Sequence, residues 1–357
     1  MTHTDAGARV ALVGCGAVVE HIHAKVLQYL LTREPIAVVA AVDPDPSRRE
    51  LISALFRGCE PIAALADLPT DTNFAIVASP VRFHAEQTIE LLRRGIHVLC
   101  EKPMAMTSRE CSQMNAAAAE AGCLLALGHV RRFYPVAVQI RDMIRNRSLG
   151  RALSFRMIEG SVYRWSAVSD AYFRRASGGG ALRDIGVHLV DLLLWWFGQP
   201  EEVDYRDDAM GGVEANVRLR LAFDGGLTGD VYLSRDSTIR QPCFIAFEHG
   251  WAAFDPYDTN RLQIGTFAGT MLDSHLHEQV GRREAPRMGV PGATFQQAFI
   301  LQFLNFMRAA AGKEMPRTSG EEGAQSIQLI ERCYSARRLV DMPWMSEKEI
   351  TQARMLT

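Results

Sequence analysis

Lys102, which is followed directly by proline, is one residue of this chain whose type and position could carry chemistry. Lys102 belongs to EKPMAM, residues 101–106, and comes straight after the apolar run GIHVLC. A residue before proline is pushed out of helical geometry, so Lys102 should leave a buried strand with its direction set by the backbone. An ammonium group held in this way can stabilise a developing negative charge. A solvated loop lysine is the alternative, and the hexapeptide alone favours it.

A carboxylate and a histidine one helical turn apart form a second candidate. In SGGGALRDIGVHLVDLLLWWFG, residues 177–198, three glycines precede a predicted helix. Asp184, His188 and Asp191 fall at positions i, i+4 and i+7 on one face of that helix. The carboxylate favours the imidazolium form, so His188 is a plausible proton acceptor. A surface or capping pair is the alternative for an isolated D-x-x-x-H.

The glycines of GCGAVV follow a short apolar strand and precede a helical pattern. Such glycines permit a tight turn and a close approach of the backbone to a pyrophosphate at the helix N-terminus. Val19 replaces the usual third glycine, which changes how closely helix and strand can pack. The predicted contacts in this turn are Gly14, Gly16, Ala17, Val18 and Val19.

Asp43 ends the second apolar strand, IAVVAAVD, where a carboxylate could accept hydrogen bonds from an adenosine ribose. A carboxylate there repels a 2′-phosphate, so NAD(H) is favoured over NADP(H). Two features count against this assignment. The spacing from Gly16 exceeds the usual ~20 residues, and Arg48 and Arg49 follow closely enough to neutralise a phosphate. A glycine turn with a solvated aspartate is the alternative reading.

The elements that must position these residues alternate in the first third of the chain. Amphipathic helical patterns separate apolar strands, which is typical of a parallel sheet covered on both faces. Those strands are predicted within RVALVG, IAVVAAVD, NFAIVASP, HVLCEKP and CLLALGHV. Later strands are longer and alternate in polarity, as in ANVRLRLAF, which favours an antiparallel or mixed sheet. We therefore expect an N-terminal doubly wound domain over residues 1–125 and a second domain over 126–357, with a long surface loop over residues 265–293.

Composition excludes several classes of protein. The 357 residues are 48% hydrophobic and 22% charged, with a net charge of −2, so no basic surface for nucleic acid is expected. No apolar run is long enough for a signal-peptide core or a membrane span. Seven cysteines without a CxxC pair indicate reduced thiols, and an intracellular, cytoplasmic protein is expected. The pairs His21 and His23, and His275 and His277, have H-x-H spacing but no further ligands, so no metal is predicted.

Taken together and in this order, the motifs resemble those of the family of glucose-fructose oxidoreductase, inositol 2-dehydrogenase and the rhizopine-catabolism oxidoreductases (Gfo/Idh/MocA). GCGAVV, EKP, GHVRRFYP and GGALRDIGVHLVDLLLWW carry the resemblance, which covers essentially the whole chain. It implies a Rossmann domain followed by an α/β domain built on a large, open, mainly antiparallel or mixed sheet. In the family that sheet often forms the interface of a homodimer or homotetramer, and the lysine–proline peptide is often cis.

The resemblance also implies roles for individual residues. Lys102 would stabilise the alkoxide beside the nicotinamide, His188 would take the hydroxyl proton, and Asp184 would orient His188 or bind a second hydroxyl. Arg131 and Arg132 would contact cofactor or substrate, with surface salt bridges as the equal alternative. Tyr163 and Arg164 could line the sugar site, with core packing as the alternative for Tyr163. The further cofactor contacts implied are Ser79, Pro80, His84, Glu101 and Lys102.

The function expected from this resemblance is hydride transfer between a nicotinamide cofactor and a sugar, cyclitol or sugar derivative, either free or nucleotide-linked. An NAD-dependent glycosidase with transient hydride transfer is one alternative. A non-catalytic, cofactor-sensing regulator is another, although retention of Lys102, Asp184 and His188 argues against it.

Overall fold

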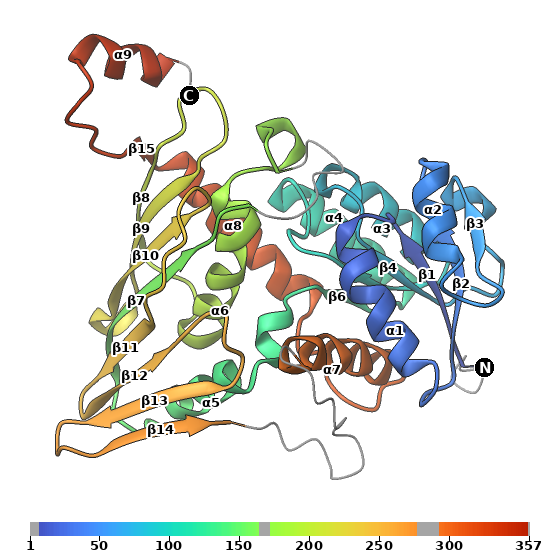
Figure 1. Ribbon diagram of the computed structural model, residues 1–357, viewed down its shortest axis with the longest axis horizontal. Helices are drawn as coiled ribbons and strands as arrows, with labels where there is room; N and C mark the ends of the chain where they lie inside the picture. The colour runs from blue at the N-terminus through green and yellow to red at the C-terminus, as the bar shows by residue number, and fades with distance from the viewer. Residues whose placement is uncertain (1–6, 164–171, 277–292, 356–357) are drawn as a thin grey trace. The chain divides into compact units, whose positions relative to one another are not determined.

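The computed structural model describes residues 7–163, 172–276 and 293–355, which Figure 1 draws as a ribbon. Within those ranges the chain forms two compact units. The first contains residues 7–130 and 296–327, and the second contains the remainder. The first unit therefore includes a late segment of the chain in addition to the N-terminal strands.

The first unit is built on a six-stranded parallel sheet. In order across the sheet its strands are β3 (Glu60–Ile62), β2 (Ile36–Val42), β1 (Ala8–Val13), β4 (Phe74–Val77), β5 (His97–Cys100) and β6 (Leu125–Leu127). The chain moves outward from β1 to β3 and then returns to β4 on the other side of β1. Right-handed crossovers in opposite directions place the connecting helices on opposite faces of the sheet. This confirms the predicted doubly wound Rossmann domain.

The helices of the first unit begin and end at recognisable signals. They are α1 (Ala24–Leu30), α2 (Pro46–Ser53), α3 (His84–Arg93), α4 (Ser108–Ala121) and most of α7 (Ala293–Ala310). Before α4, Thr107 and Glu110 form a capping box, which satisfies backbone amides at the helix start. Gly122 ends α4 in the left-handed conformation, at the glycine that predicts its end. The turn before α1, Val19–His23, is π-helical.

Helix α7 supplies side chains to the core of the first unit. The ring of Phe299 lies edge-on to His23 with centroids 5.7 Å apart, and Phe306 meets Phe74 of β4 at 5.4 Å. Gln302 donates a hydrogen bond of 3.2 Å to the carbonyl oxygen of Leu127, which ends β6. These contacts explain why a segment so late in the sequence belongs with the N-terminal strands.

The second unit is built on a nine-stranded mixed sheet. In order its strands are β14 (Met271–His275), β13 (Arg261–Thr266), β12 (Gly250–Phe254), β11 (Cys243–Phe247), β7 (Ala152–Gly160), β10 (Thr228–Ser234), β9 (Asn216–Ala222), β8 (Glu202–Asp207) and β15 (Arg337–Leu339). β7 and β10 are parallel neighbours, as are β8 and β15, and the other pairs are antiparallel. The predicted mixed sheet is therefore confirmed.

One helix packs closely on this sheet. The unit contains α5 (Pro135–Arg145), α6 (Val187–Phe197), the end of α8 (Gly320–Ser335) and α9 (Glu347–Met355). Phe197 of α6 stacks on Phe155 of β7 at 5.6 Å, and Trp196 meets Phe254 of β12 at 5.9 Å. Trp196 also donates a hydrogen bond to the carbonyl oxygen of Ala137 in α5. Contact on several sides explains why α6 is apolar over most of its circumference.

The loop predicted over residues 265–293 is wrong in part. Strand β14 lies within it and pairs with β13, with Leu272 opposite Ile264. β14 is an edge strand whose residues are mostly exposed, so its sequence lacks the alternation that marks a half-buried strand. Residues 277–292, which include His277, lie outside the described ranges.

Three further observations bear on function. Within the described ranges, no helix has both the length and the apolar character needed to cross a membrane. All seven cysteines are thiols. The described residues contain no group of three or more His, Cys, Asp or Glu side chains arranged to hold a metal ion.

Candidate functional site

Five strands of the first sheet end in a single row. Register partners link Val42 to Val13, Val13 to Val77, Val77 to Cys100, and Cys100 to Leu127. Each of these residues is the last of its strand. The residues that follow therefore lie along one edge of the sheet, where doubly wound proteins bind ligands. That edge carries Gly14, Asp43, Ser79, Glu101 and Lys102.

The glycine turn stands where the direction of winding reverses. Gly14 has a φ of +85°, and a Cβ on it would lie 2.4 Å from the backbone nitrogen of Ser79, so only glycine fits between the ends of β1 and β4. A Cβ on Gly16 would meet nothing within 4 Å, which leaves open space beside the helix start. Val19 is fully buried and packs in the core. Gly16, Ala17 and Val18 are partly exposed, as residues that contact a pyrophosphate must be.

The carboxylate of Asp43 joins the end of β2 to the glycine turn. It accepts a hydrogen bond of 2.8 Å from the backbone N–H of Cys15 and one of 2.9 Å from that of Asp45. Arg48 donates to the carbonyl oxygen of Cys15 and to Glu20, and Arg49 donates to the carbonyl oxygen of Asp43. Both arginines are thus held by other groups rather than by the Asp43 carboxylate.

The loops after β4 and β5 are joined by a buried histidine. Nε2 of His84 lies 2.7 Å from the carbonyl oxygen of Ser79, and Nδ1 lies 2.9 Å from that of Pro103. Burial lowers the pKa of His84 from its ordinary value, against the two carbonyl oxygens, which raise it. With 1% of its surface exposed, His84 fixes these two loops relative to each other. Ser79 and Pro80 remain partly exposed.

Lys102 follows β5 by two residues, and its peptide bond to Pro103 is cis. From Cys100 to Ala105, Lys102 is the one residue that is not buried. Its neighbour Glu101 is turned inward: one carboxylate oxygen lies 2.8 Å from Nε2 of His23, and the other accepts a hydrogen bond from the Lys102 amide. Glu101 therefore ties the Lys102 backbone to the helix that begins after the glycine turn.

The buried pair of His23 and Glu101 should contribute strongly to stability. We expect His23→Ala to lower the free energy of unfolding by about 3–5 kcal/mol, because it leaves a buried carboxylate without its partner. Equilibrium urea unfolding followed by circular dichroism measures this. Glu90→Gln in α3 is the control, because it breaks an exposed pair with Arg94 and should cost about 0.3–0.5 kcal/mol. Equal effects of the two substitutions would contradict the prediction.

The same pair makes a prediction about pH. Burial alone would raise the pKa of Glu101, but the hydrogen bond and charge of His23, together with Lys102, outweigh it and hold the pKa below its usual value. A carboxyl group whose pKa is lower in the folded state than in the unfolded state stabilises the fold at pH values above its unfolded pKa of ~4.3. That stabilisation is lost as the pH falls through the folded-state pKa. The difference in the free energy of unfolding between wild type and Glu101→Gln, measured by urea unfolding at a series of pH values, should therefore shrink below about pH 4.

In the second unit, Asp184 is paired with an arginine. The turn that carries it, Leu182–Gly186, is π-helical and leads directly into α6. Nη2 of Arg235 lies 2.5 Å from Oδ2 of Asp184, and the Arg235 guanidinium also lies over the ring of Tyr163 at 5.1 Å. Arg235 donates further hydrogen bonds to the backbone and hydroxyl oxygens of Ser161. Since Gly160 and Ser234 are register partners, Ser161 and Arg235 leave adjacent parallel strands at the same edge.

Tyr163 belongs to an aromatic group at this edge. Its ring centroid lies 5.1 Å from those of both Tyr172 and Phe173, which are 40% and 52% exposed. Burial, then Tyr172 and Asp184, raises the pKa of Tyr163 to about 12, so its hydroxyl stays protonated near neutral pH. Tyr163 lies beyond the end of β7 rather than on it, and Arg164 is outside the described residues.

The predicted row of Asp184, His188 and Asp191 on one helix face needs correction. The π-helical turn adds a residue to the turn that contains Asp184, so the regular i, i+4 relation to His188 does not hold. Asp191 is 1% exposed and pairs with Arg132. His188 is partly exposed, whereas its neighbours Val187 and Leu189 are buried.

Arg131 and Arg132 form buried ion pairs rather than surface salt bridges. Arg131 donates two hydrogen bonds, of 2.6 and 2.7 Å, to Glu159, and Arg132 donates two, of 2.7 and 2.9 Å, to Asp191. The surface alternative is therefore wrong, because both carboxylates are 1% exposed. Contact of either arginine with a ligand stays a prediction.

Arg235 is a candidate site residue that sequence reasoning missed. It follows the strand pattern LTGDVYLS directly. Its position resembles that of Lys102, as a charged residue at the exit of an apolar strand. That signal could have identified it, but its pairing with Asp184 depends on the turn Leu182–Gly186 packing against β10, which no local motif encodes.

Two family models match the chain. Residues 8–129 match the GFO/IDH/MocA oxidoreductase family with an NAD-binding Rossmann fold, and residues 137–253 match the GFO/IDH/MocA C-terminal domain. These ranges contain every residue discussed at the two strand edges.

Individual relatives agree with this match. The chain is 35% identical to 1,5-anhydro-D-fructose reductase of Ensifer adhaerens, over 72% of this chain and 75% of that protein. It is 32% identical to D-glucoside 3-dehydrogenase of Escherichia coli K12 over 55% of this chain, a match that spans only 56% of that relative. The solved WlbA dehydrogenase of Chromobacterium violaceum, in complex with NADH and UDP-GlcNAcA, has a TM-score of 0.78 and 23% identity, covering 93% of this chain and 94% of that one. This last likeness is one of fold.

Proposed function

Because the chain belongs to the GFO/IDH/MocA oxidoreductase family, we propose that it transfers hydride between NAD(H) and a hydroxyl or keto carbon of a sugar, cyclitol or sugar derivative. The observation that carries this proposal is the row of strand ends, which brings Gly14, Asp43, Ser79 and Lys102 to one edge. A dinucleotide lying along such an edge would have its reactive end near Lys102 and its adenosine end near Asp43.

The residues at this edge fit a dinucleotide. The open space at Gly16, beside the start of a helix, suits a pyrophosphate that accepts hydrogen bonds from backbone amides. The Asp43 carboxylate, already fixed by the Cys15 amide, is suited to accept hydrogen bonds from ribose hydroxyls. When bound, the nicotinamide supplies the hydride chemistry, and the protein supplies position and proton handling.

The protein side chains then have distinct roles. For alcohol oxidation, Lys102 stabilises the developing alkoxide, and His188 accepts the hydroxyl proton. Asp184 pairs with Arg235, and the pair offers both an acceptor and donors to further hydroxyls of the substrate. Tyr163, with a protonated hydroxyl, can donate another hydrogen bond.

A carbohydrate substrate is supported by the edge of the second sheet. The exposed rings of Tyr172 and Phe173 offer flat apolar surfaces, and Asp184 and Arg235 offer hydrogen bonds. Sites for small molecules commonly combine apolar surfaces with a few fixed polar groups. Two relatives, D-glucoside 3-dehydrogenase and 1,5-anhydro-D-fructose reductase, are named for sugar substrates.

A panel of sugars, sugar phosphates, nucleotide sugars and cyclitols tests the proposed function. We expect purified protein to change the absorbance of the reduced cofactor with at least one class. Release of an aglycone from aryl glycosides without net cofactor reduction would instead indicate a glycosidase. Tight cofactor binding without any turnover would indicate a sensor.

We also propose that one face of the nine-stranded sheet, the face opposite to α6, binds a second copy of the chain. Phe244, 37% exposed, stacks on Trp251 at 5.7 Å, and Arg156 lies over Tyr232. We expect Phe244→Glu to shift a dimer or tetramer toward monomer in sedimentation velocity, because it buries a charge in the interface. Trp344→Glu, at an aromatic outside the sheet, is the control. A monomeric wild type would contradict the proposal.

The cytoplasm is the compartment that we propose. A reducing environment is consistent with seven thiols in one chain. Burial raises the pKa of Cys15 and of Cys243 to about 12, so these side chains are unreactive core thiols.

A further inference from the structure

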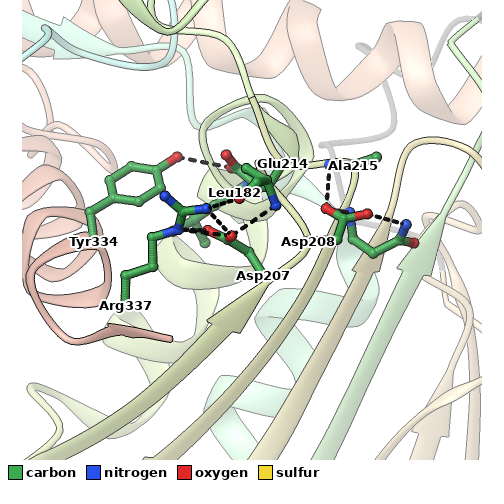
Figure 2. Close-up of polar contacts among 9 residues, drawn as sticks. Leu182, Asp207, Asp208, Glu214, Ala215, Tyr334 and Arg337 are labelled. Atoms are coloured by element: carbon green, nitrogen blue, oxygen red, sulfur yellow. Dashed lines mark hydrogen bonds and ion pairs between the residues drawn. The ribbon is translucent and has the colours of Figure 1, made fainter. Parts of the chain in front are cut away.

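A buried carboxylate from a distant loop lies at the start of the helix that carries Asp184 and His188 (Figure 2). Glu214, between β8 and β9, is 5% exposed. One of its carboxylate oxygens accepts a hydrogen bond of 3.0 Å from the backbone N–H of Leu182, and its own carbonyl oxygen accepts one of 3.0 Å from that of Ala181. Glu214 thus satisfies two amides that a helix start leaves without intrahelical partners.

A glycine makes this approach possible. Gly180 has a φ of +117°, and a Cβ on it would lie 2.4 and 2.5 Å from the two carboxylate oxygens of Glu214. The carboxylate therefore lies directly against the Gly180 backbone. Any side chain at this position would both strain the backbone and displace Glu214. This contact explains why Gly180, the last glycine of SGGGALRD, has no side chain.

The loop that carries Glu214 is itself held at its ends. Figure 2 shows Asp208 accepting a hydrogen bond of 2.9 Å from the backbone N–H of Ala215. The same carboxylate accepts bonds from the backbone and side chain of Asn216. Glu214 therefore lies next to a closed turn, and its side chain is presented to the helix from a fixed backbone.

On its other side Glu214 is held by the C-terminal part of the chain. Tyr334, in α8, donates a hydrogen bond of 2.9 Å to the same carboxylate oxygen, and Arg183 of the helix start lies over the Tyr334 ring at 5.5 Å. The neighbouring Asp207 is neutralised by Arg337, which donates to both of its oxygens. Burial raises the pKa of the Glu214 carboxyl group above its usual value. Among the described residues Glu214 forms no ion pair, and its oxygens face the amides at the positive end of the helix.

We propose that Glu214 is a positioning residue for hydride transfer: it fixes the start of the helix and so the placement of Asp184 and His188. The proposal rests on the proposed function. It follows from the direct hydrogen bond to Leu182, two residues before Asp184, and from the close contact with Gly180. A carboxylate that served only general stability would not need to reach the first amides of this particular helix.

Two substitutions separate positioning from folding. In Glu214→Gln an amide oxygen can still accept the Leu182 hydrogen bond, whereas Glu214→Ala removes the contact. We expect Glu214→Ala to lower kcat about 100-fold, as small misplacements of reacting groups do, with the dissociation constant for NADH unchanged. Glu214→Gln should recover most of that loss. Asp273→Asn, which breaks an exposed pair with Arg261 in the same unit, is the control and should leave kcat unchanged.

Hydrogen exchange supplies a readout that needs no substrate. The amides of residues 181–188 should exchange faster in Glu214→Ala than in wild type, while those of β9 and β10 stay the same. Unchanged exchange at 181–188 would overturn the proposal, as would a folded Glu214→Ala protein with wild-type kcat. If no compound in the panel is turned over by wild type, the proposed function fails, and the exchange result still decides whether Glu214 holds the helix.

Discussion

His188→Ala is expected to lower kcat about 100- to 10,000-fold, the range for loss of a general base, while the dissociation constant for NADH stays at the wild-type value. His188 belongs to the second unit, so its removal leaves the glycine turn, Asp43 and the loops after β4 and β5 unchanged. Lys102→Ala should lower kcat about 100- to 1,000-fold, as loss of one group that stabilises an oxyanion does. Each substitution removes an interaction made in the transition state, so kcat and kcat/KM should fall together.

Steady-state kinetics with saturating cofactor measure the loss of kcat. Titration of NADH, followed by its fluorescence, measures cofactor binding separately. The matched controls are His249→Ala and Lys313→Ala, at an exposed histidine of the second unit and an exposed lysine of the first. Neither control should change kcat. Wild-type turnover in either single variant would rule out the assignment of that residue.

The parts of the site that sequence could predict are those fixed by local chemistry. Apolar strands followed by Gly14, Asp43, Ser79 and Lys102 predict one functional edge, since parallel strands deliver their exits to the same side. Gly14 is required by the backbone of Ser79, yet the G-x-G pattern alone already indicates a turn. In these cases the relevant interaction is with the residue's own strand or turn.

The parts that sequence could not predict depend on which elements become neighbours. Arg235 meets Asp184 because the turn Leu182–Gly186 packs against β10, and Glu214 meets Leu182 through a loop with no motif of its own. Arg131 is followed by a second arginine in a stretch that reads as polar, yet both turn inward because Glu159 and Asp191 neutralise them. A charged residue in a sequence gives no indication of whether its partner is water or a buried carboxylate.

The regular geometry assumed for a helix also limits prediction. The spacing of Asp184, His188 and Asp191 places them on one face only if every turn has 3.6 residues. A π-helical turn opens two of the helices that bear on the predicted site, at Val19–His23 and Leu182–Gly186. Such turns are frequent at functional sites, but neither sequence contains a signal that separates them from an α-helical turn.

Cofactor choice should show the other large effect: we expect NADH to bind at least ~100-fold more tightly than NADPH, about 2.7 kcal/mol. A carboxylate next to a 2′-phosphate can cost several kcal/mol through like-charge repulsion. The Asp43 carboxylate is fixed by the amides of Cys15 and Asp45, so it cannot turn away without breaking two hydrogen bonds. Arg48 and Arg49, which could neutralise a phosphate, are held by carbonyl oxygens and by Glu20.

Two substitutions distinguish the charge of Asp43 from its structural contacts. Asp43→Asn keeps an oxygen for the Cys15 amide and removes the charge, so it should tighten NADPH binding and weaken NADH binding only slightly. Asp43→Ala also removes the hydrogen bond that supports the glycine turn. It should therefore narrow the preference for NADH over NADPH and weaken the binding of both cofactors. Asp67→Asn, at an exposed position of the same unit, should change neither affinity. Titration of both reduced cofactors into cofactor-free protein measures these differences. NADPH binding as tight as that of NADH in wild type would mean that Asp43 does not lie beside the ribose.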